Sequence, residues 1–193
     1  MTRGPSEIAW TFATCAAGHA ASYVLAQAAA MPGSMGRICL IAPTWWGPLP
    51  TITGKPKEAY EWIVRAVDEP LVGPLLYQLN VNRFTMRMMG RGHVYTDPDW
   101  LAGTRLAEKL VVTRNEGARF ASVRFVTGAL DMLQNRAELL SLAGRVTDPI
   151  LMIYAAGTPP KSKAEMEAFA GLKNVRAAIL SSGKLSVHEE FPR

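Results

Sequence analysis

Four short runs of apolar residues, separated by helical sequence, constrain the fold of this chain more than any other feature. The runs lie near residues 9–17, 37–43, 149–155 and 175–181, and their apolar residues are continuous rather than alternating. This composition is typical of strands in a parallel sheet that is covered on both faces. The helical sequence between the runs supplies the crossovers that such strands require. We therefore expect an α/β fold with a parallel sheet of about four strands in sequential order.

The second and third runs are separated by about a hundred residues with a helical pattern and no convincing strand. This insertion, residues 50–147, divides a core made of residues 1–49 and 148–193. Open α/β sheets bind ligands at the carboxyl ends of their strands, so a long insertion at that edge is typical of a cap over a site. We expect residues 50–147 to form a helical cap and the helix that returns to the core.

Helix boundaries are indicated at two places. The pair Asp97-Pro98 combines a capping residue with a first-turn proline and predicts the start of a cap helix. Ser162 and Glu165 have the spacing of a capping box, which predicts the start of a helix between the last two strands. Gly171 lies just past the expected end of that helix.

A sharp turn between the first strand and the first helix is predicted by the small residues from Gly18 to Ser22 (GHAAS). Glycine and alanine permit the close approach of strand and helix that such a turn needs. We expect Ala20 at the apex of the turn, facing a cavity lined partly by Trp45 or Trp46.

Composition excludes several classes of function. The chain has 193 residues, of which 49% are apolar and 19% charged, with a net charge of +5. No lysine-rich block or run of alternating basic and aromatic residues supports nucleic-acid binding. No apolar run is long enough to predict a transmembrane segment, and the first ten residues lack the pattern of a signal peptide.

The two cysteines, Cys15 and Cys39, both lie in apolar, strand-like sequence. This position predicts reduced residues of the core, in keeping with a reducing compartment. No group of His, Cys, Asp or Glu has the spacing of a metal site. We expect neither a metal nor a cofactor.

The turn GHAAS resembles the nucleophile elbow, Gly-x-Ser-x-Gly, of the α/β-hydrolase superfamily. The segments APTWWGPLP, GARFASVRFVTGALD, PPKSKAEMEAF and EEFP resemble a plant, algal and cyanobacterial branch of that superfamily. Together these segments span residues 18–192. The resemblance implies a partial α/β-hydrolase fold, its C-terminal half, with a helical cap. It also implies an intracellular protein of the plastid or cytoplasm.

The sequence departs from the superfamily at all three positions of the catalytic triad. Ala20 stands in place of the serine nucleophile, Thr158 in place of the acid, and Lys184 in place of the histidine. A Ser–His–acid relay needs a nucleophilic oxygen, a base and an orienting carboxylate. A lysine has a reference pKa of about 10.4, and only strong desolvation would make it a base. The resemblance therefore predicts a degenerate triad.

Three other residues are candidates for a non-standard site. Ser22 is either a displaced nucleophile or a small residue that lets the helix pack closely on the sheet. His19 is either a general base or a residue that packs beneath the site. His188 is either a base or a surface residue beside Glu189 or Glu190.

Two groups of residues are candidates for binding. The arginines of the cap recur at every fourth position and are suited to a phosphate, carboxylate or lipid headgroup, unless they form a solvated helix face. The paired tryptophans follow the second strand and either line an apolar pocket or anchor the cap. The candidate pocket and binding residues are Trp45, Trp46, Ala21, Arg83, Arg87 and Arg91.

The missing triad favours a non-catalytic protein that binds a small apolar or amphipathic molecule or another protein. The alternative is a hydrolase of small ester-like substrates that uses non-standard residues. A third reading is one half of a larger assembly, because four strands precede the elbow in the superfamily and about ten residues precede the first strand here. An N-terminal half or a partner chain would then complete the sheet, and the 193-residue chain alone would be poorly stable.

Overall fold

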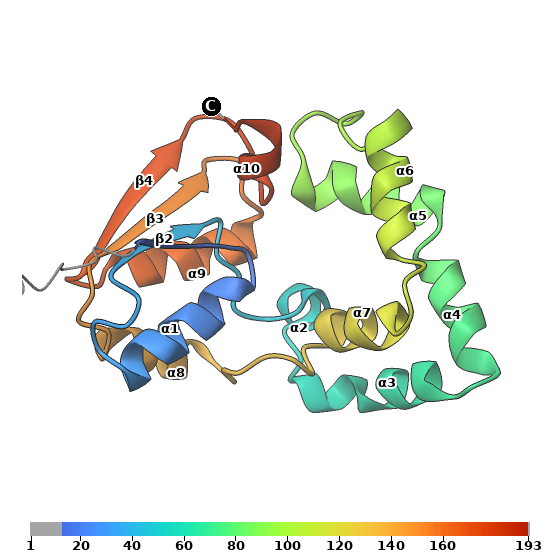
Figure 1. Cartoon of the computed structure of the whole chain (residues 1–193), viewed down its shortest axis with the longest axis horizontal. Coiled ribbons are helices and arrows are strands. Elements are labelled where there is room, and N and C mark those ends of the chain that lie inside the picture. The colour runs from blue at the N-terminus through green and yellow to red at the C-terminus, as the bar shows by residue number, and fades with distance from the viewer. Residues whose placement is uncertain (1–12, 193) are drawn as a thin grey trace, which may run out of the picture.

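A parallel sheet of four strands forms the centre of the computed structural model, which describes residues 13–192 (Figure 1). Its strands are β1 (Ala13–Ala17), β2 (Arg37–Ile41), β3 (Ile150–Ala155) and β4 (Val175–Leu180). They lie in the order β1-β2-β3-β4, and each pair is parallel. The expected α/β fold and strand order are confirmed. Residues 9–12 of the first expected strand lie outside the described residues.

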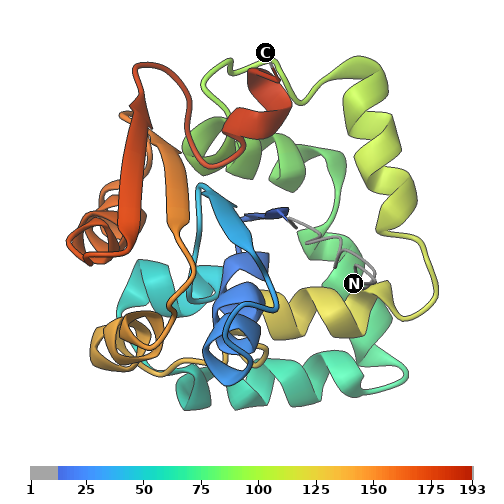
Figure 2. The ribbon, with the colours of Figure 1, turned by 60° about the vertical axis from the view of Figure 1, so that its left-hand side comes forward.

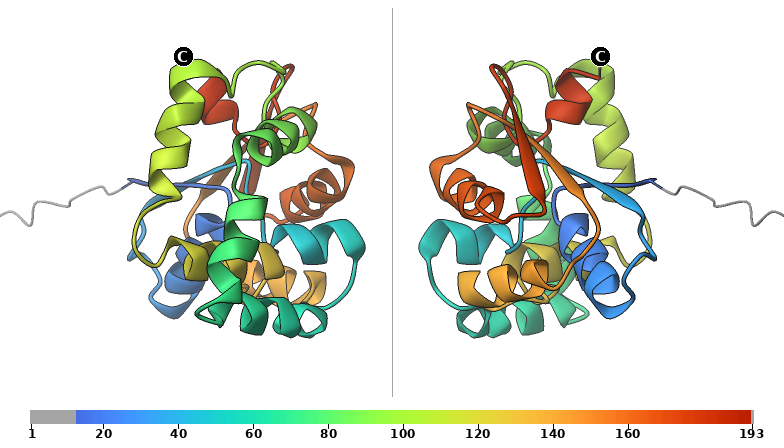
Figure 3. Two further views of the ribbon diagram at one scale, coloured as in Figure 1. Left: turned by 90° about the vertical axis from the view of Figure 1, so that its right-hand side faces the viewer. Right: turned by 90° about the vertical axis from the view of Figure 1, so that its left-hand side faces the viewer.

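One face of the sheet is covered by three helices, α1 (Ala20–Ala30), α8 (Arg136–Gly144) and α9 (Pro160–Ala170) (Figures 1 and 3). The strand residues that share this face pack with these helices in one apolar cluster. They include alternate residues of β2 and β3, namely Ile38, Leu40, Ile150, Met152 and Tyr154. The main core of the protein therefore lies on this side of the sheet.

The opposite face of the sheet is more exposed. Cys15 is exposed, Cys39 is intermediate, and Leu151 and Leu180 each retain 37% of their accessible surface. The expectation that both cysteines are core residues is therefore wrong for Cys15. The reason is that α1, α8 and α9 all pack against the other face, so the continuous apolar strands are not covered equally on both sides.

Residues 50–147 contain helices and, throughout this fully described segment, no strand (Figure 2). A second, smaller apolar cluster holds part of this segment together around Tyr95, Leu101, Leu106 and Leu110. The helices before α8 are α2 (Pro48–Thr53), η1 (Lys57–Tyr60), α3 (Glu61–Asp68), α4 (Val72–Asn80), α5 (Arg83–Met89), the π-helical turn η2 (Gly90–Val94), α6 (Gly103–Val112) and α7 (Ala118–Thr127).

Two expected helix starts are wrong. Asp97 does not begin α6, which starts at Gly103, because the Asp97 carboxylate accepts a hydrogen bond from the Asp99 amide in a local turn. Ser162 lies inside α9, which starts at Pro160, and Glu165 binds Arg136 instead of closing a capping box. A proline at the first helical position thus sets the start of α9.

The short helix α10 (Val187–Glu190) is tied to the helical segment. Both carboxylate oxygens of Glu190 accept hydrogen bonds from the amide of Thr96, at 2.8 and 2.9 Å, and the amide of Asp97 donates to one of them at 2.8 Å. The Ser186 amide donates to the carbonyl oxygen of Val94. These bonds join residues that are more than 90 positions apart in the sequence.

A second carboxylate of α10 strengthens this connection. Glu189 accepts hydrogen bonds from the hydroxyl of Tyr95 and from the ammonium of Lys109, both at 2.9 Å. Burial alone would raise the pKa of Glu189, but the two donors outweigh it and hold that pKa below its usual range. Burial and the neighbouring Glu189 raise the pKa of Tyr95, so the phenol remains a donor.

Candidate functional site

The turn between β1 and α1 has the tight form that the sequence predicts. Gly18 has a φ of +57°, a conformation that favours glycine. Its carbonyl oxygen accepts hydrogen bonds from the amides of Ala21 and Thr44, and its amide donates to Ile41. Ala20 is the first residue of α1 and is exposed. An exposed methyl group, which cannot act as a nucleophile, therefore occupies the start of this helix.

Ala21 and Ser22 follow within the first turn of α1 and are fully buried. Ala21 belongs to the main apolar cluster. The hydroxyl oxygen of Ser22 is inaccessible and has no hydrogen-bond partner among residues 13–192. A buried hydroxyl that is not hydrogen-bonded to a base cannot attack a substrate in this conformation.

His19 precedes the apex and is enclosed by other side chains. Its Nε2 atom lies 3.2 Å from Oδ1 of Asp131, although the two atoms are not aligned for a hydrogen bond. The imidazole packs edge-on against Phe125, with ring centres 5.4 Å apart, and against Tyr23. The side chains of His19 and Asp131 are only 11% and 2% exposed, so this contact is buried beneath the elbow.

Asp131 lies in the connection between α7 and α8 and holds three segments together. The amide of Gly47 donates to both of its carboxylate oxygens, at 3.1 and 2.9 Å. The amide of Asp131 itself donates to the carbonyl oxygen of Gly128. Sequence reasoning did not select Asp131, because its partners lie more than 80 residues away. The only local signal is an acidic residue that follows a glycine turn.

The loops after β3 and β4 contain Thr158 and Lys184, the two residues that the resemblance aligns with the acid and the histidine of a triad. Thr158 is buried, and its amide donates to the carbonyl oxygen of Ala155. The ammonium of Lys184 donates to the carbonyl oxygens of Arg91 and Gly92, at 2.9 and 3.4 Å. The Lys184 side chain is therefore engaged by the helical segment, and it acts as a hydrogen-bond donor there.

His188 lies on α10, directly after Val187, which belongs to the main apolar cluster. Its side chain is 38% exposed, and its Nε2 atom lies 4.0 Å from the carboxylate of Glu189. This is the surface position beside a glutamate that the sequence offers as one of two alternatives.

The three arginines that recur at every fourth position, Arg83, Arg87 and Arg91, lie on α5 and η2. Arg87 and Arg91 both bind one carboxylate oxygen of Asp99, at 3.0 and 2.7 Å. The hydrogen bond from Arg91, with the weaker one from Arg87, holds the pKa of Asp99 below its usual range. Arg83, Arg87 and Arg91 line a concave surface together with Phe84 and Met88, and the hollow that this surface encloses has a volume of about 660 Å³.

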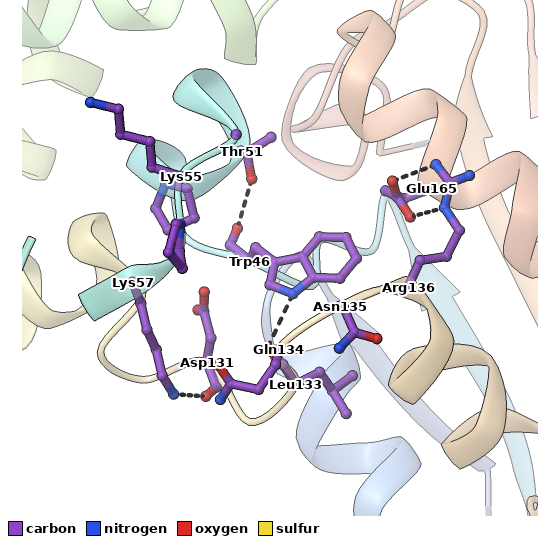
Figure 4. Close-up of a pocket in the computed structure, with 13 residues that line it drawn as sticks. Trp46, Thr51, Lys55, Lys57, Asp131, Leu133, Gln134, Asn135, Arg136 and Glu165 are labelled. Atoms are coloured by element: carbon purple, nitrogen blue, oxygen red, sulfur yellow. Dashed lines mark hydrogen bonds and ion pairs between the residues drawn. The ribbon is translucent and has the colours of Figure 1, made fainter. Parts of the chain in front are cut away.

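A pocket of about 300 Å³ lies beside Trp46 (Figure 4). The Trp46 indole donates to the carbonyl oxygen of Leu133, and the ammonium of Lys57 donates to that of Asp131. Arg136 and Glu165 form a two-pronged ion pair on the opposite wall. The remaining lining residues are Pro50, Thr51, Gly54, Lys55, Pro56, Gln134 and Asn135.

The two tryptophans therefore differ in position. Trp45 is buried in the main core, with its ring centre 5.1 Å from that of Phe169, and it does not line this pocket. Ala20 lines neither the pocket nor the concave arginine surface. Asp131 connects the elbow with the pocket, because its carboxylate faces His19 and its carbonyl oxygen binds Lys57.

Two features are missing from residues 13–192. No three His, Cys, Asp or Glu side chains are grouped as metal ligands would be. No helix in that range has both the length and the apolar composition needed to cross a bilayer.

No protein-family model and no curated protein matches this sequence. Several solved structures are similar to this chain. Cfl2 from Burkholderia cenocepacia has a TM-score of 0.63 and 19% identity, over 94% of this chain and 62% of its own. The α/β-hydrolase MGS-M2, from a deep-sea metagenome library, has a TM-score of 0.57, 11% identity and the same two coverages. A mutant of haloalkane dehalogenase DatA from Agrobacterium tumefaciens has a TM-score of 0.57 and 15% identity, over 93% and 62%. The chain thus spans less than two thirds of these proteins and shares with them the α/β-hydrolase fold over that part.

Proposed function

We propose that this protein is a non-catalytic member of the α/β-hydrolase fold that binds a small amphipathic molecule. The placement of the triad positions supports this proposal. The elbow carries a methyl group, Thr158 is buried, and Lys184 donates to two carbonyl oxygens. The two hydrogen bonds of Lys184 are the observation that carries the argument. They bind the ammonium group that stands where a hydrolase would need a base, so this side chain does not accept a proton there.

The unmodified protein is expected to show no serine-hydrolase activity, and Ala20→Ser alone is expected not to restore it. Triad members act as a unit, so one restored hydroxyl without its base and acid recovers little. Labelling with a fluorophosphonate probe and turnover of p-nitrophenyl acetate and butyrate would measure this. An active serine hydrolase, treated in parallel, confirms that the probe is competent. Stoichiometric labelling of the unmodified protein would contradict the proposal and identify Ser22 as the residue to map first.

The contact between His19 and Asp131 favours the second candidate, a hydrolase that uses non-standard residues. His19 and a buried carboxylate 3.2 Å away are the two residue types that form the base–acid half of a relay, although their atoms are not aligned for a hydrogen bond in this conformation. The required nucleophile would be Ser22, whose hydroxyl is inaccessible in this conformation. Ester turnover that is lost in both Ser22→Ala and His19→Ala would support this candidate against the first.

The pocket beside Trp46 is the site where we place the ligand. Its volume of about 300 Å³ suits a small molecule, and its walls combine an indole with two prolines and a leucine. The Arg136 guanidinium is paired with Glu165, and the Asp131 carboxylate is held by the Gly47 amide. Beside that ion pair, the lining holds two lysines, Lys55 and Lys57, against the single carboxylate of Asp131, so it carries an excess of one positive charge. We infer a ligand with an apolar body and an anionic group.

Decanoate is the probe for this site, titrated by isothermal calorimetry. We expect Trp46→Ala and Lys57→Met each to weaken its binding about tenfold, which is about 1.4 kcal/mol. Trp62→Ala is the matched control, because Trp62 is 68% exposed and lies outside the pocket. Decanol, which has no charge, should bind the unmodified protein more weakly than decanoate. Equal affinity in Trp46→Ala and Trp62→Ala would place the ligand elsewhere.

A further inference from the structure

The two cysteines of the chain face each other across the first two strands. Cys15 of β1 and Cys39 of β2 are direct partners in the parallel register. Partners in adjacent strands have their side chains on the same face of the sheet, with strands about 4.8 Å apart. Disulfides span Cα separations of about 4.4–6.8 Å, so this pair meets the first geometric requirement for a bond.

The same pair is accessible from solvent. Cys15 is exposed and Cys39 is half-buried, on the face of the sheet that α1, α8 and α9 do not cover. Burial and the nearby Cys15 raise the pKa of the Cys39 thiol, which makes Cys39 the less reactive of the two. An oxidant would thus meet Cys15 first, with a second thiol already beside it.

We propose that Cys15 and Cys39 form a reversible dithiol–disulfide site that reacts with hydroperoxides. The Cys15 thiolate attacks one oxygen of the peroxide, breaks the O–O bond, forms a sulfenic acid and releases hydroxide, or, from an organic hydroperoxide, an alkoxide that takes up a proton to become the alcohol. The Cys39 thiol then attacks the Cys15 sulfur and displaces its hydroxyl as water, which leaves a disulfide. In total two thiols are oxidised and one peroxide is reduced. A dithiol reductant then reduces the disulfide to the two thiols and is itself oxidised. This site is independent of the proposed ligand pocket.

The experiment treats the folded protein with a stoichiometric amount of hydrogen peroxide and follows the intact mass under non-reducing conditions. We expect a monomer that has lost two hydrogen atoms and that regains them with dithiothreitol. Because the sequence contains only these two cysteines, an intramolecular disulfide must join them. We further expect this bond to form about tenfold faster in native buffer than in guanidinium chloride, where the two thiols are no longer held side by side.

Cys39→Ser supplies the control, since its Cys15 thiol should stop at the sulfenic acid or gain further oxygen atoms. Addition of oxygen to the unmodified protein without loss of two hydrogens would overturn the proposal, and so would a disulfide that forms only between molecules. A rate in native buffer no faster than the rate in denaturant would also overturn it. These outcomes can be read on the unmodified protein, so they stand even if the variant does not fold.

Discussion

Gly47→Ala is expected to cause the largest loss of stability of any substitution considered. A β-carbon at Gly47 would collide with the carbonyl oxygen of Phe125 and would lie 2.7 Å from the amide nitrogen of Gly128. These are backbone atoms of the α7 end, which cannot move aside without breaking the turn that positions Asp131. Overpacking and a weakened bond to a buried carboxylate together predict a loss of about 3–5 kcal/mol in the free energy of unfolding.

Thermal and urea unfolding, followed by circular dichroism, would measure this loss. For a chain of this size it corresponds to a fall in melting temperature of about 6–20 °C. Gly144→Ala is the matched control, because a β-carbon there meets no atom within 4 Å and Gly144 lies in α8. That variant should be slightly more stable than the original, by about 0.5–1 kcal/mol. Similar losses in both variants would disprove the close approach at Gly47.

Asp131→Ala is expected to have the second largest effect. The substitution leaves the buried amide of Gly47 without an acceptor and removes the carboxylate that faces His19. Loss of a hydrogen bond to a charged group, with a buried donor left unsatisfied, predicts a destabilisation of about 2–4 kcal/mol.

The isosteric variant Asp131→Asn separates charge from shape. Its side-chain oxygen can still accept from Gly47, so it should recover part of the lost stability. Asp99→Asn is the control for removing a carboxylate from the surface, and it should change the melting temperature little. A loss in Asp131→Ala as small as that of Asp99→Asn would show that the buried network does not stabilise the fold.

The sheet could be predicted from the sequence because its strands are marked locally. Continuous apolar runs identified all four strands, and small residues from Gly18 to Ser22 identified the turn into α1. Gly171 ends α9 as predicted. In each case the residues that define the feature are neighbours in the sequence, so propensity and packing favour the same structure.

The remaining features depend on contacts that no local pattern records. The carboxylate of Asp97 accepts a hydrogen bond within a local turn instead of capping a helix. The carboxylate of Glu165 forms an ion pair with Arg136, which lies on another helix. Cys15 has apolar neighbours in the sequence, yet it is exposed, because α1, α8 and α9 all pack against the opposite face of the sheet. Asp131 finds its partner Gly47 84 positions earlier in the chain. Sequence alone therefore located the elbow but not the network beneath it.

The link between α10 and the helical segment has a consequence for how the protein is made. Thr96 and Asp97 leave the ribosome more than 90 residues before Glu190, the residue whose carboxylate binds their amides. Until Glu190 has been synthesised, those amides can bond only to water or to other partners, and the same holds for the Tyr95 hydroxyl until its acceptor Glu189 has been synthesised. Contacts between such distant residues form slowly, because a long loop must close first. The second apolar cluster therefore reaches its final position late, after the core helices have been translated.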